Sequence, residues 1–102
     1  MPENTANNNV FCLQPVQFKS CYGPRLWVPS VYEPNLYEMK QKVRKVVGKL
    51  SLWGDTDKSG ENCKAWEFRD NAAMNEAARV LREEFGYSEI SQTEFFDKYP
   101  YI

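Results

Sequence analysis

The feature that most constrains the fold is the helical spacing of apolar residues in segment 35–50. These residues recur every three or four positions, so on a helix they occupy an arc of roughly 100°. Their positions are Leu36, Met39, Val43, Val46, Val47 and Leu50. Proline suits the first turn of a helix and asparagine caps one, so we expect the helix to begin at Pro34 or Asn35 and to end at Gly48. Such a helix is stable only when another element covers its apolar stripe.

A second amphipathic helix is predicted to run from its N-cap residue Asp70 to Phe85, with Gly86 as the residue that ends it. Its apolar stripe comprises Met74, Ala77, Ala78, Leu81 and Phe85. Further along, the run Ser91–Glu94 has the form of a capping box, in which serine is followed three positions later by glutamate. This run predicts a short third helix over residues 92–99, which a proline ends.

Short apolar runs and alternating patterns predict the strands: 10–13, 16–19, part of 22–34, 50–53 and 63–69. Three prolines in segment 22–34 favour an edge strand or an ordered loop there, because proline donates no ladder hydrogen bond. Residues 54–62 are expected to form a polar loop. We therefore expect an α+β fold: a small, mostly antiparallel sheet with two amphipathic helices packed on one face and a short C-terminal helix.

The chain has 102 residues and a mass of 11.9 kDa, which is enough for one domain. Residues 1–9 are polar and are expected to form a disordered tail, which leaves residues 10–102 as a single α+β domain. No run approaches the roughly 18 apolar residues of a transmembrane helix, so we expect no membrane partner. The N-terminal residues lack the pattern of a signal peptide, which predicts a cytoplasmic protein.

The absence of histidine excludes the usual catalytic systems and every His-ligated metal site. Cys12, Cys21 and Cys63 form no C-x-x-C pair, and their odd number predicts reduced, buried thiols. The sequence contains no nucleotide-binding, hydrolase or metalloprotease motif. We therefore expect no enzyme activity, no catalytic residue and no cofactor.

The run Asp55–Gly60 resembles the opening of an EF-hand calcium loop, with oxygen ligands at positions 1, 3 and 5 and then a glycine. Position 12 of that loop, where a bidentate glutamate closes the coordination shell, is Trp66 here. Aspartate, serine and glycine are also the residues that ordinary turns prefer. We therefore predict a polar hairpin loop and no metal site.

Charge is distributed unevenly along the chain. Residues 35–50 carry five basic side chains against one glutamate, whereas residues 51–102 carry eleven acidic side chains against six basic ones. The first helix is therefore a basic element on an acidic chain, which suggests a charged contact with a partner. The candidate binding residues on this helix are Lys42, Arg44, Lys45 and Lys49.

Aromatic side chains on segment 22–34 are a second candidate surface. Tyr22, Trp27 and Tyr32 lie there together with Arg25, and tyrosine and tryptophan are the residues that anchor protein interfaces. We expect these aromatics to be partly exposed and to contact a partner, which could be a second copy of the chain. The alternative is that they clamp an edge segment to the core.

These features favour a small non-catalytic protein that binds another protein, as an adaptor, an inhibitor or a regulatory subunit would. The alternative is a nucleic-acid-binding module that uses the basic helix 35–50. Nucleic acid ranks second because the basic residues spread around the helix and only one of them is arginine. The sequence pI of about 5.5 also gives the chain a repulsive mean field for phosphate.

Overall fold

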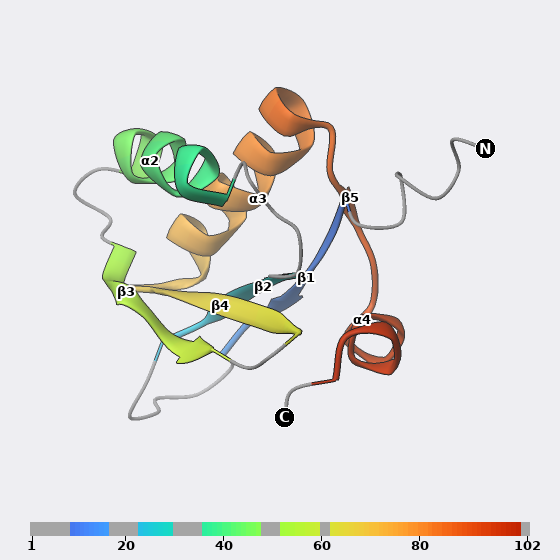
Figure 1. Cartoon of the computed structure of the whole chain (residues 1–102). Helices are drawn as coiled ribbons and strands as arrows, with labels where there is room; N and C mark the ends of the chain where they lie inside the picture. Colours follow the sequence, from blue (N-terminus) through green and yellow to red (C-terminus); the bar gives the residue numbers. More distant parts are fainter. Residues whose placement is uncertain (1–8, 17–22, 30–35, 48–51, 60–61, 101–102) are drawn as a thin grey trace.

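The computed structural model describes residues 9–16, 23–29, 36–47, 52–59 and 62–100, and within 52–59 it describes the backbone (Figure 1). Apart from Asn9, the predicted tail over residues 1–9 lies outside the described residues. So do the predicted helix boundaries Pro34, Asn35 and Gly48. The α+β fold class is confirmed by the elements that follow.

The described strands form one sheet in the spatial order β3-β4-β2-β1-β5. Neighbours pair antiparallel, except that β5 runs parallel to β1. The strands are β1 (Val10–Gln14), β2 (Arg25–Pro29), β3 (Leu52–Ser59), β4 (Cys63–Phe68) and β5 (Ser88–Glu89). The sheet is therefore mostly antiparallel, as the sequence predicts.

Two strand predictions were wrong. Strand β2 lies between β1 and β4 and is not an edge strand. Pro29 is accommodated because it is the last residue of the strand, where it faces Cys63. The second error concerns residues 54–59, which continue β3 and are not part of a loop. The register of the β3–β4 pairing shifts between Trp53 and Lys58. A strand with such an irregularity can include polar residues that a simple alternation of apolar and polar positions does not predict.

The helices are α2 (Leu36–Val47), α3 (Asn71–Phe85) and α4 (Gln92–Lys98). The predicted caps of the last two are confirmed. The Asp70 side chain accepts a hydrogen bond from the backbone N of Ala73, and that of Ser91 accepts one from Glu94. Gly86 ends α3 at a φ of 71°, in the left-handed region that favours glycine.

The sheet is covered on both faces. Figure 1 shows α2 and α3 together on one side of the sheet and α4 on the other. The main core lies between the sheet and the two longer helices, where Trp66 and Phe68 of β4 belong to one buried cluster with the apolar stripes of both helices. On the opposite face, Phe95 of α4 packs on Cys12 and Trp27. The two-helix layer confirms the prediction, and α4 adds a second, smaller core.

Val46 departs from the predicted buried stripe of the first helix. Met39, Val43 and Val47 are buried, whereas Val46 is 38% exposed. At 100° per residue, Val46 lies at the border of the apolar arc, where the covering layer ends. Leu50, the last residue of that stripe, lies outside the described residues.

Candidate functional site

A groove of about 640 Å³ lies between α2 and the C-terminal end of α3. We call it the α2–α3 groove. Five of its residues come from α2 and two from α3. They are Glu38, Gln41, Lys42, Arg44, Lys45, Glu84 and Phe85. Three basic side chains, two acidic ones, an amide and one aromatic ring therefore meet at this surface.

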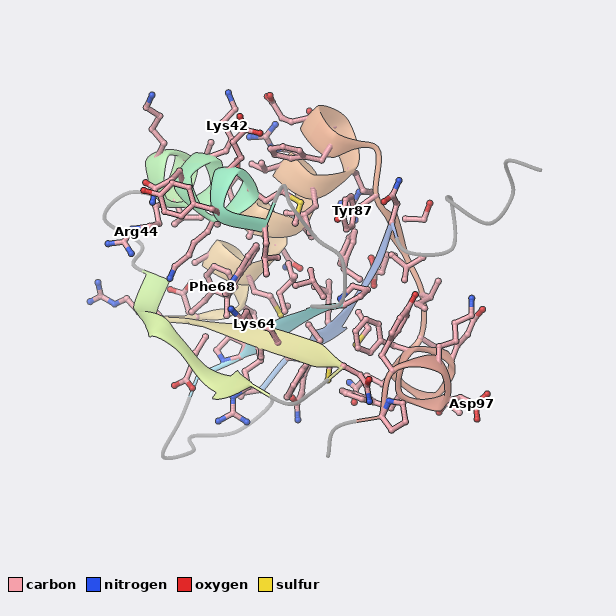
Figure 2. The ribbon with its side chains drawn as sticks, viewed as in Figure 1. Lys42, Arg44, Lys64, Phe68, Tyr87 and Asp97 are labelled. Carbon is pink, nitrogen blue, oxygen red and sulfur yellow. The ribbon has the colours of Figure 1, made fainter. Side chains whose placement is uncertain are left out.

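The two sides of the groove are joined by an ion pair. Lys42 Nζ lies 3.6 Å from Glu84 Oε1, and the two side chains are 46% and 47% exposed. In Figure 2, Lys42 points along the side of α2 near α3, whereas Arg44 leaves the helix in another direction. Lys45 follows Lys42 by three positions, so the two ammonium groups lie on adjacent turns of one helix face.

Exposed apolar side chains flank the groove. Among the described side chains, the exposed large hydrophobic residues are Tyr37, at 72%, and Val46, at 38%. Both belong to α2. Tyr37, Gln41 and Arg44 follow one another at spacings of four and three, so they form one stripe along the helix. The outer face of α2 thus combines basic groups with apolar ones.

The groove brings together part of the predicted site. Lys42, Arg44 and Lys45 all line it. Three further predicted binding residues, Tyr22, Tyr32 and Lys49, lie outside the described residues. Arg25 and Trp27 lie on β2, a strand of the sheet that the helices cover, and do not line the groove.

The predicted partial exposure of Trp27 was wrong. Its side chain is 5% exposed, because Phe96 of α4 packs edge-on against it with the ring centroids 5.2 Å apart. Its indole Nε1 donates a hydrogen bond of 2.9 Å to Gln14 Oε1. One edge of β2 pairs with β1 and the other with β4, so residues 25–29 offer no free strand edge to a second copy of the chain.

Arg25 belongs to a buried polar network. Its Nε lies 3.4 Å from Oε1 of Glu67, and Oε2 of the same carboxylate accepts a hydrogen bond of 3.0 Å from the backbone N of Gly23. The Arg25 and Glu67 side chains are only 11% and 6% exposed. This network joins β2 to β4 and the turn before β2, so the structure gives Arg25 a stabilising contact in the interior.

Sequence reasoning missed four of the groove residues and the exposed tyrosine. Glu38 and Gln41 were readable as polar positions of α2, but nothing in the sequence shows which polar positions face a neighbouring helix. Glu84 and Phe85 belong to the groove only because α3 packs beside α2 with its C-terminal end near Lys42. The sequence signal that could have revealed this surface is Tyr37, an aromatic residue on the polar side of a helical pattern.

The groove can bind charged groups but has no arrangement suited to covalent chemistry. Its titratable groups are lysine, arginine and glutamate. The Lys42–Glu84 pair is solvent-exposed, whereas catalytic acid–base pairs are commonly held in buried surroundings. Within the described residues, no cluster of three or more cysteine, aspartate or glutamate side chains could hold a metal ion.

Two thiols lie under α4, on the face opposite the groove. Cys12 and Cys63 are fully buried and free, as predicted, and Cys21 lies outside the described residues. Burial, together with the charges of Cys63 and Glu89, raises the pKa of Cys12 to about 12. Burial also raises the pKa of Cys63. Strand β2 separates the two cysteines, so their Cα atoms are at least about 9 Å apart, which is too far for a disulfide.

These thiols should resist both alkylation and oxidation in the folded protein. In a Cys21→Ser variant at neutral pH, we expect Cys12 and Cys63 to react with a thiol reagent at least about a hundredfold more slowly than after unfolding. Above pH 9.0 the unfolded chain loses the Cys12 proton, whereas the folded chain retains it until about pH 12. The free energy of unfolding should therefore fall as the pH rises from 9.0 to about 12. Mass spectrometry of labelled protein measures the rates, and fast labelling of the native state would contradict the prediction.

Comparisons of this chain with protein-family models, with curated proteins and with solved structures give no match. In the part of the chain that the structure describes, each helix is too short or too polar to cross a bilayer.

Proposed function

We propose that this chain is a non-catalytic binding protein that engages another protein through the outer face of α2 and the α2–α3 groove. The observation that carries the proposal is the position of Tyr37 and Val46. These exposed hydrophobic residues lie on the helix that also supplies most of the groove. Interfaces combine aromatic and apolar anchors with a charged rim, and α2 has both. An adaptor, an inhibitor or a regulatory subunit would use such a surface.

The alternative partner is a nucleic acid, which the basic residues of α2 could contact. Glu38 and Glu84 line the same groove as the basic residues, and their carboxylates repel phosphate. Val46 has no group that binds phosphate, whereas an exposed tyrosine and an exposed valine on one helix suit the apolar part of a protein interface. The buried free thiols also fit a reducing compartment, so we propose that the protein acts in the cytoplasm.

The proposal is tested by photo-crosslinking at two exposed helix positions. A photoreactive residue at Gln41, in the groove, is expected to give a protein adduct in living cells. The same residue at Thr93, an exposed position of α4, should not give that adduct. Mass spectrometry identifies the adduct, and a second copy of this chain is one of its outcomes. Adducts that nuclease removes, or equal yields of the same adduct from both positions, would overturn the proposal.

Tyr37→Ala should then weaken binding of the purified partner more than any other single truncation on α2. Aromatic anchors at interfaces contribute roughly 2 kcal/mol or more, which is a loss of about 30-fold in affinity. Thr93→Ala serves as the matched control and should change the dissociation constant less than about twofold. Calorimetric titration measures both variants. A Tyr37→Ala protein that binds like the native one would remove Tyr37 from the interface.

A further inference from the structure

We propose, on the basis of the function proposed above, that the α2–α3 groove takes an acidic segment of the partner protein. In the bound state a carboxylate of that segment replaces Glu84 as the ion-pair partner of Lys42. The occupant is an amphipathic peptide that presents carboxylates together with an apolar side chain. Three features of the groove favour this occupant: the exposure of the Lys42–Glu84 pair, the spacing of the cationic groups and the apolar groups beside them.

The Lys42–Glu84 pair is open to exchange. Its atoms are 3.6 Å apart, and both side chains are nearly half exposed. Exposed ion pairs contribute little to folding stability, because water screens the charges and two long side chains must be ordered. A carboxylate from outside can therefore take over Lys42 at little cost to the fold.

The groove has other donors beside Lys42. Gln41, Lys42 and Lys45 project from one arc of α2, which spans roughly 100° at 100° per residue. Two ammonium groups on adjacent turns match two carboxylates about one helical turn apart, and the amide of Gln41 can donate to either. Lysine binds as a single point charge, so each of the two ammonium groups can pair with a separate carboxylate.

Apolar side chains lie beside these donors. Phe85 lines the groove and packs against the main core, so part of its ring faces the groove from a fixed position. Val46 follows Lys42 by four positions and is 38% exposed. A partner with only acidic residues would leave both side chains in water. A partner that alternates carboxylates with leucine or a similar residue would cover them.

The charge of the whole chain gives the groove its selectivity. The chain has a formal net charge of −1, whereas α2 carries four basic side chains against the single acidic Glu38. An acidic segment is therefore repelled by most of the surface and attracted at this helix. Such a field directs association to one place and makes its rate depend on salt.

A pair of synthetic peptides tests this proposal. The probe is a fluorescent amphipathic peptide of about 15 residues built from glutamate, leucine and alanine, and its partner has glutamine in place of every glutamate. At low salt, fluorescence anisotropy should show that the native chain binds the glutamate peptide at least about tenfold more tightly than the glutamine peptide. Equal affinity for the two peptides would overturn the proposal.

Single-charge variants locate the binding. Lys42→Gln and Lys45→Gln should each weaken binding of the glutamate peptide by about fivefold or more. Glu84→Gln should strengthen it by about threefold, because it removes the competing carboxylate from Lys42. Lys98→Gln removes the same charge from α4 on the other side of the sheet, where Figure 2 shows the neighbouring Asp97, and should have no effect. Thermal melts of each variant confirm that it is folded.

Two results would contradict this assignment. If Glu84→Gln weakens binding as much as Lys42→Gln, the pair supports the groove and is not exchanged. If single-stranded DNA of matched charge binds more tightly than the glutamate peptide, the groove is a phosphate site. The two proposals can fail separately. If a partner crosslinks at Gln41 but the two peptides bind equally, the proposal of protein binding stands and only the proposal of an acidic segment is ruled out.

Discussion

Gly23→Ala should destabilise the protein by about 3 kcal/mol or more, which is a large part of the stability of a small domain. An ideal Cβ at Gly23 would lie 2.0 Å from the backbone oxygen of Phe68 and 3.2 Å from its carbonyl carbon. The clash is with strand backbone, which cannot turn aside as a flexible side chain would. The backbone N of Phe68 also donates to the oxygen of Pro24 at 2.9 Å, so the two segments are held at this distance. Relief of the clash would break the start of the β2–β4 pairing.

Gly86→Ala is the matched control for this prediction. Gly86 has a φ of 71°, and a Cβ built there meets nothing within 4 Å. Its replacement therefore costs only the left-handed backbone strain, roughly 1 kcal/mol. Urea unfolding followed by tryptophan fluorescence measures both variants, provided that their m-values agree. If Gly23→Ala is too unstable to fold, circular dichroism reports the unfolded chain, which is also an expected outcome. A Gly23→Ala protein as stable as Gly86→Ala would refute the steric argument.

The helices were predictable because their signals are local. The N-cap of α3 at Asp70, its glycine stop at Gly86 and the capping serine of α4 all depend on residues within a few positions of each other. Caps of this kind satisfy backbone groups of the helix itself, so they need no knowledge of the rest of the fold. The same locality explains why the ion pairs of Arg79 with Glu76 and Glu83 follow from their spacing in α3.

The strand order was not predictable in the same way. Strand β2 was expected at an edge because Pro29 cannot donate a ladder bond, yet it is central because that proline is its last residue. Strand β5 is only two residues long and depends on its parallel pairing with β1, the first strand of the chain, from which it is far removed in sequence. A segment of this length carries no periodic signal. Pairing partners were therefore the missing information, not the tendency to form strands.

The same limit applies to the candidate site. The basic residues of α2 were found from charge alone, and three of them line the groove. Trp27 was expected at the surface because nothing in the sequence shows that α4 covers the second face of the sheet. The groove itself depends on the packing of α2 beside α3, which brings Lys42 within 3.6 Å of Glu84 despite their separation along the chain. The sequence therefore predicts which charged residues α2 carries, whereas only the packing of the helices shows which of them lie together.

Glu67 was missed for a related reason. It lies between Trp66 and Phe68 in β4, and strand alternation correctly places it on the face opposite the main core. Because the two longer helices are expected on one face only, nothing in the sequence predicts that a side chain on the other face is buried. In the structure Glu67 is 5% exposed, and it is the buried charged residue among the described side chains. Its contacts make it the second site at which a single substitution should have a large effect.

Glu67→Ala is expected to destabilise the protein by about 3 kcal/mol, because it removes the carboxylate that the largely buried Arg25 side chain and the buried backbone N–H of Gly23 share. Arg25 loses its contact at 3.4 Å, and the backbone N of Gly23 loses its acceptor at 3.0 Å. Glu67→Gln separates the two losses, since its amide oxygen can still accept from Gly23 while the charge opposite Arg25 is gone. We expect the glutamine variant to lose about half as much stability as the alanine variant.

Glu83→Ala, which removes an exposed carboxylate from the solvent side of α3, should cost less than about 0.5 kcal/mol. Urea unfolding of the three variants gives the comparison. Equal costs for Glu67→Ala and Glu83→Ala would show that the Arg25–Glu67 contact does not join β2 to β4 as the structure indicates.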